Sequence, residues 1–308
     1  MTALLKRKIE FDGFGIALRQ WLSGEVTGHL GTYMYTEDSD DHRWKNGHSA
    51  TTYYLGRDDK ATFDLALKDL GIEVTNFFDL GPGGEAAVRA KTIPLVAAIK
   101  AKNYYPIDLS TTLAQGACEL VKETLQVSGE PVVADFFEPL PVNKPDALLA
   151  FMGGTLGNIE THNSAASLQN RLTQIFSHFR KAASGNSRFL VSFDANTNVK
   201  EILSCYQNEE FGGLIRSCID RALDTGDFEY DVTWRADNYQ LATGLRSTQD
   251  QIIDLGDEQF SVEQGEFLPV LNSYRFPAQF VKEAAEKAGW KYQKEWSATG
   301  RVHYLLFS

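Results

Sequence analysis

Glycines gather directly after an aspartate in FFDLGPGGEAA, residues 77–87. Asp79 ends an apolar run, and Gly81, Gly83 and Gly84 follow within five positions. Glycine permits positive φ and lets a ligand approach the backbone closely. The stretch is not a phosphate-binding P-loop, because no Gly-Lys-Ser/Thr follows, and it lacks the third glycine of a dinucleotide fingerprint. A tight strand–helix turn would use the same residues, so the glycines alone do not identify a ligand.

Acidic residues end the next two apolar runs. Asp108 lies at the end of NYYPIDL, 27 residues after Gly81, and a carboxylate there can accept hydrogen bonds from both hydroxyls of a ribose. Asp135 and Phe136 end the third run, where a carboxylate can bind the exocyclic amine of adenine while the ring lies against the base. Asp108 could instead cap a helix or lie on the surface, and ADFFEPL could be a solvated acidic turn.

The stretch FMGGTLGN, residues 151–158, ends the fourth run and exposes backbone groups and one amide side chain, Asn158. It could also be a loop without a ligand. Taken in order, the four stretches offer a glycine-lined bed, a partner for a ribose and a partner for an adenine, and none of them is a phosphate site. S-Adenosylmethionine is an adenosine without phosphates, and its sulfonium cation suits an acidic, aromatic crevice. The sequence therefore predicts S-adenosylmethionine as the cofactor.

These residues need elements that bring the ends of separate apolar runs together. Five such runs lie between residues 75 and 194, and their apolarity is continuous, as in strands buried on both faces of a parallel sheet. The runs are 75–80, 103–109, 131–136, 146–153 and 188–194. Helical stretches are expected at 110–127, with an N-cap at Ser110, and at 161–183, while Pro94 should break a helix or start a new one. This alternation predicts a doubly wound α/β core, which binds ligands outside the carboxyl ends of its strands.

The rest of the chain predicts a hairpin and a second lobe. A helix at 277–289, closed by Gly289, precedes an antiparallel hairpin of 290–296 and 301–308. In the preceding region we expect a helical stretch at 199–223, strands at 228–234, 239–246 and 251–255, and a further segment at 258–268. The expected domains are a core of residues 56–197 and 286–308 and a smaller α+β substrate-binding lobe of residues 1–55 and 198–285.

Composition argues against several classes of protein. The 308 residues carry a formal net charge of -11, whereas a nucleic-acid binder would normally present a basic face. No apolar run approaches the ~18 residues of a membrane span, and the N-terminal residues lack the apolar core of a signal peptide. Three dispersed cysteines indicate reduced thiols, and His42 and His48 indicate a solvated loop rather than a metal site. We expect a cytoplasmic protein with a small-molecule partner and no metal, nucleic acid or membrane; the oligomeric state is not indicated.

A family resemblance combines these motifs. The stretches DLGPGGE, YYPIDLS, ADFFEPL, FMGGTLGN, SCYQNEEFGG and NSYRF together resemble the histidine-specific N-methyltransferase family, which includes the ergothioneine-pathway histidine Nα-methyltransferase and fungal dimethylallyltryptophan N-methyltransferases. The resemblance spans residues 30–308. It implies a class I Rossmann-like S-adenosylmethionine-dependent methyltransferase core with a C-terminal antiparallel hairpin, a smaller lobe, a substrate held between them, and a place in secondary metabolism.

The resemblance also implies roles for individual residues. Four of them would bind S-adenosylmethionine: Gly81, Asp108, Asp135 and Phe136. We expect Gly83 of the same glycine loop to bind the cofactor as well. Gly153 and Asn158 would lie beside the α-amino group of the substrate, where Asn158 orients the lone pair. Tyr206 would bind the substrate carboxylate, although it could equally be a packing residue of an amphipathic helix. Tyr53 would lie near the substrate ring, with Tyr54 as a rival and Tyr35 as a further match; Tyr53 and Tyr54 could also be core aromatics.

Two departures from the family pattern concern the substrate and the cofactor. Histidine-specific members hold the imidazole with a glutamate and a serine two residues later, and this chain has Leu271 and Ser273 at those positions. A leucine cannot accept the imidazole N–H, and an unpaired buried donor costs about 1–3 kcal/mol. The family lysine that follows the glycine motif is also missing, since Ala86 and Ala87 occupy the area; Arg89 could replace it.

The sequence thus predicts an S-adenosylmethionine-dependent N-methyltransferase. Its expected substrate is the α-amino group of an amino acid, or of a small molecule derived from one, that is larger or more apolar than histidine. Histidine itself is one alternative. A nicotinamide-dependent oxidoreductase is another, against which the missing third glycine and the C-terminal hairpin argue. A non-catalytic S-adenosylmethionine-binding protein is the last, but it would have no need for both Asn158 and Tyr206.

Overall fold

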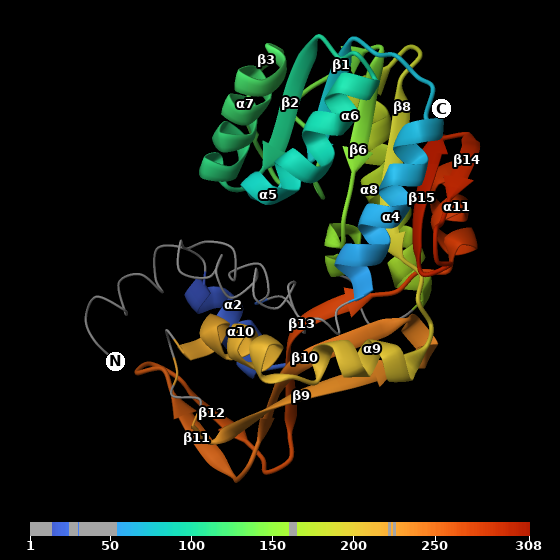
Figure 1. Ribbon diagram of the computed structural model, residues 1–308. Helices are drawn as coiled ribbons and strands as arrows, with labels where there is room; N and C mark the ends of the chain where they lie inside the picture. Colours follow the sequence, from blue (N-terminus) through green and yellow to red (C-terminus); the bar gives the residue numbers. More distant parts are fainter. Residues whose placement is uncertain (1–13, 25–29, 31–53, 160–164, 221–222, 224–225) are drawn as a thin grey trace. The chain divides into compact units, whose positions relative to one another are not determined.

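The computed structural model describes residues 14–24, 30, 54–159, 165–220, 223 and 226–308. The chain forms two compact units, each with its own core (Figure 1). Unit 1 contains the described residues of 1–54 together with 197–274, and unit 2 contains 55–196 and 275–308. The chain therefore passes from one unit to the other three times, between residues 54 and 55, 196 and 197, and 274 and 275.

Unit 2 is built on an eight-stranded sheet in the order β14-β15-β8-β6-β1-β2-β3, with β4 beside β2. The strands are β1 (Asn76–Leu80), β2 (Asn103–Asp108), β3 (Ser128–Gly129), β4 (Val132–Val133), β6 (Ala147–Phe151), β8 (Arg188–Asp194), β14 (Tyr292–Trp296) and β15 (Val302–Phe307). All pairs from β8 to β3 and β4 are parallel, whereas β15 runs antiparallel to β8 and to β14. This arrangement confirms the predicted doubly wound core and its C-terminal antiparallel hairpin.

The central strands are buried along their whole length. Every residue of β1 and β6 is buried, as their continuous apolar runs predict. Aromatic pairs connect β1 to β2, with ring centroids 5.7 Å apart for Phe77 and Tyr104 and 5.0 Å apart for Phe78 and Tyr105. The strand expected at 131–136 is wrong in its length, because only the two residues of β4 pair with β2. Beyond β4, the carboxylate of Asp135 accepts the N–H of Phe137 at 2.8 Å and turns the chain away from the sheet.

Helices cover both faces of this sheet. They are α4 (Tyr54–Asp69), α5 (Glu85–Ala87), the π-helical turn η2 (Val88–Thr92), α6 (Ile93–Ala98), α7 (Thr111–Leu125), α8 (Ala165–Ala182) and α11 (Ala278–Lys287), with the 3₁₀ turn η3 (Thr155–Asn158) and the short pair β5 (Lys144–Pro145) and β7 (Ala183–Ser184). In Figure 1, α4 and α6 lie on the viewer's side of the sheet and α8 on the far side. Ser110 caps α7 as predicted, since its Oγ accepts the N–H of Leu113 at 3.3 Å. Pro94 lies at the second residue of α6, so a new helix begins there as expected.

The helix α11 belongs to unit 2, whereas the expected lobe boundary placed residues up to 285 in the smaller lobe. It packs against α8, where Gln169 Nε2 donates to Glu283 Oε2 at 3.0 Å. Directly after it, Trp290 Nε1 donates to the carbonyl of Phe176 at 2.9 Å in the interior. Val281, Ala284 and Ala285 form its buried stripe. These contacts assign α11 to the larger unit.

Unit 1 has a three-stranded antiparallel sheet in the order β13-β10-β9 and a separate hairpin. The elements are α2 (Phe14–Leu22), α9 (Val199–Tyr206), α10 (Glu209–Asp220), β9 (Phe228–Arg235), the 3₁₀ turn η4 (Ala236–Asn238), β10 (Gln240–Ser247), β11 (Gln251–Asp254), β12 (Gln259–Val262) and β13 (Phe267–Tyr274). The three predicted strands correspond to β9, β10 and β11. The segment expected at 258–268 instead contains β12 and the start of β13. Trp21 anchors α2 to β13 by donating to the carbonyl of Pro269 at 2.7 Å.

The helix predicted at 199–223 is wrong as a single element, because two helices occupy this stretch. Gln207 leaves helical geometry with ψ of 63°. Asn208 Oδ1 then accepts the N–H of Phe211 at 3.0 Å and caps α10. The break reorients the chain directly after Tyr206.

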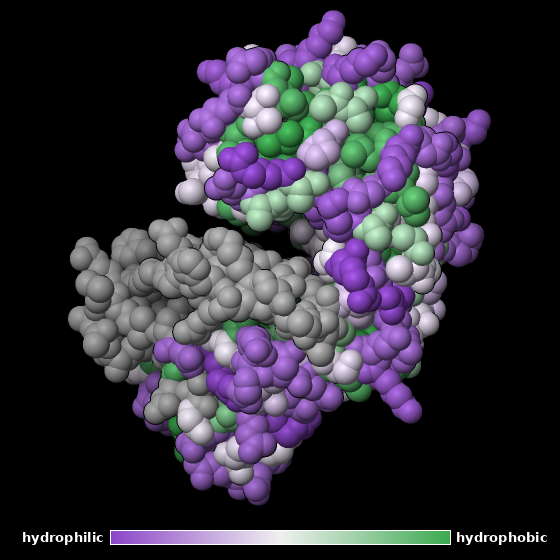
Figure 2. All heavy atoms as spheres, viewed as in Figure 1, coloured by the Kyte–Doolittle hydropathy of each residue, from purple (hydrophilic) through white to green (hydrophobic). Residues whose placement is uncertain are grey.

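Polar residues cover much of the surface. Figure 2 shows hydrophilic side chains over most of the visible rim of unit 2, with apolar ones between them. Among the described residues, Leu65, Leu109 and Val133 are the large apolar side chains of unit 2 that are exposed. None of the helices in the described ranges combines the length and the apolarity that crossing a membrane requires.

Candidate active site

The glycine loop lies at the edge of the unit 2 sheet where the parallel strands end, called the carboxyl edge below. Gly81 and Gly83 have φ of 71° and 73°, in the left-handed region that favours glycine. A Cβ on Gly81 would lie 3.4 Å from the ring of Phe136, and one on Gly83 would lie 3.2 Å from Cβ of Ala87. The N–H of Gly81 also donates to the carbonyl of Ile107 at 2.9 Å. The loop therefore lies close to the end of β2 and against the turn that carries Phe136.

Asp79 lies directly under this loop and is 1% exposed. Its Oδ2 accepts hydrogen bonds from Thr92 Oγ1 at 2.6 Å and from Tyr104 Oη at 3.1 Å. Burial raises the pKa of Asp79 to about 6, against the lowering effect of these two hydrogen bonds. The carboxyl group connects the end of β1 to the π-helical turn and to β2, and so supports the glycine loop from below.

Asp108 ends β2 and is half-buried. Its Oδ1 accepts the N–H of Ser110 at 2.8 Å, and burial raises the pKa of this carboxyl group. Since Ser110 caps α7, Asp108 is not the cap of that helix. It instead presents a carboxylate at the carboxyl edge, next to the glycine loop, where a ribose would need one.

Asp135 and Phe136 lie in the turn after β4, and this turn is stiffened by aromatic contacts. The ring of Phe136 packs edge-on against Phe137 and Phe151, with centroids 4.9 and 5.3 Å apart. Phe151 is the last residue of β6, so the turn is fixed to the strand that leads to the next motif. The structure thus brings the acidic-aromatic pair to the glycine loop, as the sequence order predicts.

Gly153 and Asn158 follow β6 at the same edge. Gly153 has φ of 86°, and its N–H donates to Ser192 Oγ of β8 at 2.7 Å. Asn158 is half-buried at the end of η3. Seven predicted site residues therefore share the carboxyl edge of unit 2: Gly81, Gly83, Asp108, Asp135, Phe136, Gly153 and Asn158.

Lys91 is a cation at this edge that the sequence reasoning missed. Its Nζ lies 3.2 Å from the point where a Cβ on Gly153 would stand, and 2.9 Å from Asp59 Oδ2. Arg89, the expected substitute for the missing lysine, instead pairs with Glu85 on the exposed side of the helix at 2.7 Å. A lysine twelve residues beyond Asp79 in the sequence was the available signal, but the π-helical turn between them determines which side chain faces the site.

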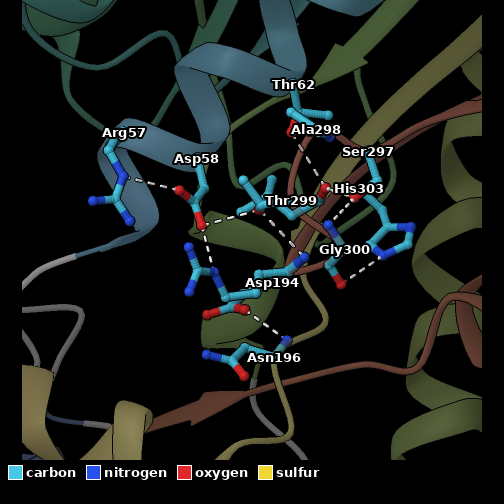
Figure 3. A network of polar contacts seen from close by, with 12 residues as sticks. Arg57, Asp58, Thr62, Asp194, Asn196, Ser297, Ala298, Thr299, Gly300 and His303 are labelled. Atoms are coloured by element: carbon cyan, nitrogen blue, oxygen red, sulfur yellow. Dashed lines mark hydrogen bonds and ion pairs between the residues drawn. The ribbon is translucent and has the colours of Figure 1, made fainter.

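A second polar network lies at the end of β8 and is drawn in Figure 3. Asp58, 1% exposed, accepts hydrogen bonds from Arg301 Nε at 2.6 Å, Thr299 Oγ1 at 3.0 Å and Arg57 Nε at 3.2 Å (Figure 3). Burial acts to raise the pKa of Asp58, but the hydrogen bonds from Arg301, Arg57 and Thr299 outweigh it and lower that pKa below its usual value. This carboxylate is thus charged and connects α4 to the turn between β14 and β15.

Asp194 extends the network at the last residue of β8. Its Oδ2 lies 2.7 Å from Nε of the buried Arg275, and its Oδ1 accepts the N–H of Asn196 at 2.9 Å. The carbonyl of Arg301 accepts the N–H of Ala195 at 2.6 Å. Charged side chains therefore lie near all three points at which the chain leaves unit 2, at residues 55, 196 and 275.

The predicted substrate residues of unit 1 share one face of its sheet. Leu271 and Ser273 are two residues apart on β13, so their side chains lie on the same face. They pair with Thr243 and Leu241 of β10, respectively. Tyr230 of β9 lies on the same face, and its hydroxyl donates to the carbonyl of Tyr206 at 2.8 Å. Tyr206, Leu271 and Ser273 are thus on one side of the sheet, which the sequence spacing could not show.

These side chains differ in exposure. Tyr206 is 6% exposed, with its ring 4.7 Å from that of Phe211, so it packs as well as any core residue. Ser273 is buried and Leu271 is half-buried. Tyr54 is buried at the first residue of α4. Tyr35 and Tyr53 lie outside the described residues.

The residues at the carboxyl edge fit S-adenosylmethionine. Two glycines at positive φ leave an open backbone bed, Asp108 offers a carboxylate, and the ring of Phe136 lies against the bed. Lys91 adds a cation next to Gly153, as an aminoacyl carboxylate requires. Within the described ranges, no group of three or more histidine, cysteine, aspartate or glutamate side chains could hold a metal ion. The donor set thus suits a nucleoside with an amino-acid tail.

Solved structures similar to this chain have low sequence identity to it. An S-adenosylmethionine-dependent methyltransferase from Clostridium acetobutylicum ATCC 824 is 11% identical, with 86% of this chain and 98% of that chain covered and a TM-score of 0.48. A protein from Pyrococcus horikoshii OT3 is 14% identical over 85% and 93% of the two chains, with a TM-score of 0.47. The sugar N-methyltransferase of Streptoalloteichus sp ATCC 53650 is 11% identical over 85% and 90%, with a TM-score of 0.42. No curated protein matches the sequence.

The sequence model of one family matches residues 31–307, which is most of the chain and every strand of both units. That family is described as histidine-specific, S-adenosylmethionine-dependent methyltransferases. The match agrees with the strand order of unit 2 and with the donor set at its carboxyl edge, and it rules out the nicotinamide-dependent alternative. The chain therefore belongs to the histidine-specific, S-adenosylmethionine-dependent methyltransferase family, and S-adenosylmethionine is its cofactor.

Proposed function

We propose that this methyltransferase acts on the α-amino group of an amino acid, or of a small molecule derived from one, other than histidine. Leu271 carries this proposal. It occupies the position at which the family pattern has the glutamate that accepts an imidazole N–H, and Ser273 alone remains of that pair. A buried imidazole donor without an acceptor would cost about 1–3 kcal/mol. A larger or more apolar side chain, such as an aromatic one, would instead pack against leucine.

The proposed cofactor contacts come from unit 2. Asp108 would accept the ribose hydroxyls, and Asp135 would accept the exocyclic amine of adenine while the ring of Phe136 lies against the base. Gly81 and Gly83 would line the path of the aminoacyl tail. Lys91 would donate to the tail carboxylate, since its ammonium has three N–H donors and uses one of them on Asp59.

When bound, S-adenosylmethionine supplies an electrophilic methyl group that is already activated by the sulfonium charge. The residues of the chain then have to position and desolvate the amine rather than provide acid–base catalysis. The amine must be neutral, because an ammonium has no lone pair. The side-chain carbonyl of Asn158, the backbone at Gly153 and the hydroxyl of Tyr53 are the proposed acceptors for its remaining protons. Tyr206 is the proposed partner of the substrate carboxylate, with Ser273, Tyr54 and Tyr35 around the substrate.

Histidine is the second candidate substrate, and the family description favours it. Ser273 is retained and could accept or donate one hydrogen bond to an imidazole. The two candidates differ in one respect that can be measured directly, namely which amino acid gives the highest kcat/KM. Three dispersed cysteines suit a reducing compartment, so we propose that the protein is cytoplasmic. From the family resemblance we also propose a role in secondary metabolism.

Screening the twenty amino acids and common amines with S-adenosylmethionine, with mass detection of the product, tests this proposal. We expect a mass increase of one or more methyl groups on the α-amino nitrogen of an amino acid other than histidine. Methylation at a hydroxyl or ring nitrogen, or a preference for histidine over all other amino acids, would overturn it. Asp108→Ala should abolish turnover in the same screen, because the proposed ribose contact would be lost.

A further inference from the structure

Lys91 is held in a defined place at the carboxyl edge although it has a long, flexible side chain. The side chain is 18% exposed, and its Nζ lies 3.2 Å from the position of a Cβ on Gly153. A Cβ at position 153 would be in tight contact with this ammonium, so Lys91 would have to move slightly away. Gly153 also has φ of 86°, which favours glycine at this position, and the absence of a side chain permits the close approach of Lys91.

Asp59 and Tyr304 account for that placement. Lys91 Nζ lies 2.9 Å from Asp59 Oδ2, and Tyr304 Oη donates to Asp59 Oδ1 at 2.7 Å. Asp59 is buried, and Tyr304 is completely buried. Burial and the adjacent carboxylate raise the pKa of Tyr304 well above its usual value, so its hydroxyl remains protonated and donates at any physiological pH.

Strand β8 lies between Tyr304 and Gly153. Tyr304 pairs with Ser192 in the register of β15 and β8, and Ser192 Oγ accepts the N–H of Gly153 at 2.7 Å. The Lys91 ammonium thus lies between Asp59 of α4, which Tyr304 of β15 holds, and Gly153, which Ser192 of β8 holds. An ion pair that served only to fasten α4 to the core would not need a glycine with positive φ opposite the lysine.

We propose that Asp59 and Tyr304 are positioning residues for the cofactor, which hold the Lys91 ammonium against Gly153 so that it can donate to the α-carboxylate of S-adenosylmethionine. This inference rests on the proposed contact between Lys91 and the cofactor tail. A free lysine side chain loses about 2 kcal/mol of rotamer entropy when it is fixed. Fixing it in advance removes most of that cost from ligand binding. Tyr304 does the same for Asp59, whose second oxygen it occupies.

The test compares two ligands that differ only in the carboxylate. Calorimetry gives the Kd of S-adenosylmethionine and of its decarboxylated form, and their ratio measures how much the carboxylate contributes. Lys91→Met should remove the preference for the carboxylate. Asp59→Asn should reduce the ratio about tenfold, which is about 1.4 kcal/mol. Tyr304→Phe should reduce it in the same direction by a smaller factor. Asp59→Asn added to Lys91→Met should cause no further change.

Asp64→Asn is the matched control, since Asp64 pairs with Lys60 on the exposed side of the same helix at 2.6 Å and should leave the ratio unchanged. If Asp59→Asn does not fold, Tyr304→Phe tests the inference on its own, since it removes only a hydroxyl. An unchanged ratio in the folded variant overturns the inference. A raised ratio also overturns it, because Asp59 would then compete with the carboxylate for Lys91. The proposed function is tested separately, by methyl transfer to an amine in the wild-type protein. Its presence would support that function whatever the ratio of Kd values shows, and its absence would reject the function without affecting the conclusion from the ratio.

Discussion

At the scale of single residues, the proposed choice of substrate rests on Leu271. Leu271→Glu restores an acceptor for an imidazole N–H, two residues before Ser273 on the same face of β13. A hydrogen bond to a charged group contributes about 1.5–3 kcal/mol. We therefore expect kcat/KM for histidine to rise by about tenfold or more, and that for the preferred substrate to fall.

Leu271→Met is the matched control for this substitution, because it keeps the volume and adds no acceptor. It should not increase activity toward histidine. A folded Leu271→Glu variant with no gain on histidine would show that position 271 does not contact the substrate side chain, and the argument against histidine would then be lost.

The raised pKa of Asp79 predicts that the free energy of unfolding depends on pH. Its pKa is about 6 in the folded protein and 3.8 in the ordinary reference state, so the fold disfavours the ionised form. The resulting destabilisation is absent below about pH 4, grows between pH 4 and 6, and reaches roughly 3 kcal/mol above that range. Asp79→Asn keeps an acceptor for Thr92 and Tyr104 but cannot ionise. The free energy of unfolding of the variant relative to wild type should therefore rise by about that amount from pH 4 to 7 in denaturant titrations.

A difference between Asp79→Asn and wild type that does not change with pH would contradict this account. Asp69→Asn serves as a control on the exposed surface of the same unit, where the pKa of Asp69 is lowered rather than raised by Lys294 and Trp296. Its relative stability should fall, not rise, as the pH increases through the acidic range.

The proximity of residues at different strand ends is predictable, because a parallel sheet brings the carboxyl ends of its strands to one edge. The sequence alone therefore groups Gly81, Asp108 and Asp135. It was not enough for Lys91, because the π-helical turn shifts the direction of every side chain after Val88. Arg89, the substitute suggested by the sequence, pairs with Glu85 instead. Asp59 and Tyr304 come from distant parts of the chain, and no local pattern connects them to the glycine loop.

At the scale of elements, the network around Asp58 holds α4 to the β14–β15 turn. Asp58→Asn would leave Arg301 without its charged partner in a site where the carboxylate is 1% exposed. Arg301 is only partly buried, but the neutral amide in the buried position would form weaker hydrogen bonds with it, and we expect a loss of about 2 kcal/mol in the free energy of unfolding at neutral pH. Since the pKa of Asp58 is lowered in the fold, this contribution should disappear as the pH falls through that pKa.

The matched control for Asp58→Asn is Asp64→Asn, which breaks an exposed pair on the same helix and should cost less than about 1 kcal/mol. Urea titrations of both variants at pH 7 and pH 3 give the comparison. Equal losses for the two variants at pH 7, or a loss for Asp58→Asn that does not decrease from pH 7 to pH 3, would show that the network does not stabilise the fold through its charge.

Elements with strong local signals were predicted well, and edge elements were not. The buried runs that became β1, β6 and β8 are long and continuous, so their periodicity is unambiguous. The run at 131–136 has only two residues in the sheet, since the side chain of Asp135 accepts the backbone N–H of Phe137 and turns the chain. The break at Asn208 depends on a side-chain cap, which competes with continuation of the helix, and on the packing of α10 against β9 and β10.

At the scale of the whole molecule, the sequence order of strands and helices was sufficient to predict the class of the larger unit. The hairpin that adds β15 antiparallel to β8 was visible as two aromatic-rich runs around a short turn. The division into units was less accessible, because it depends on which surface a helix covers. The helix α11 shows this, as its apolar stripe alone does not name a unit and its contacts with α8 and β14 assign it.

The two units should respond to different ligands, and hydrogen exchange can separate them. S-Adenosylmethionine binds only the folded protein, so saturating ligand stabilises it by about 2.7 kcal/mol at one hundred times its Kd. We expect slowed amide exchange at residues 79–83, 108–110 and 135–137 of unit 2 when the cofactor is added alone. Subsequent addition of the accepted amine should slow exchange at 199–206 and 267–274 of unit 1, which carry Tyr206, Leu271 and Ser273. Because local protection reports where a ligand contacts the chain, cofactor that protected β13 and left the glycine loop unchanged would reverse the assignment of the two units.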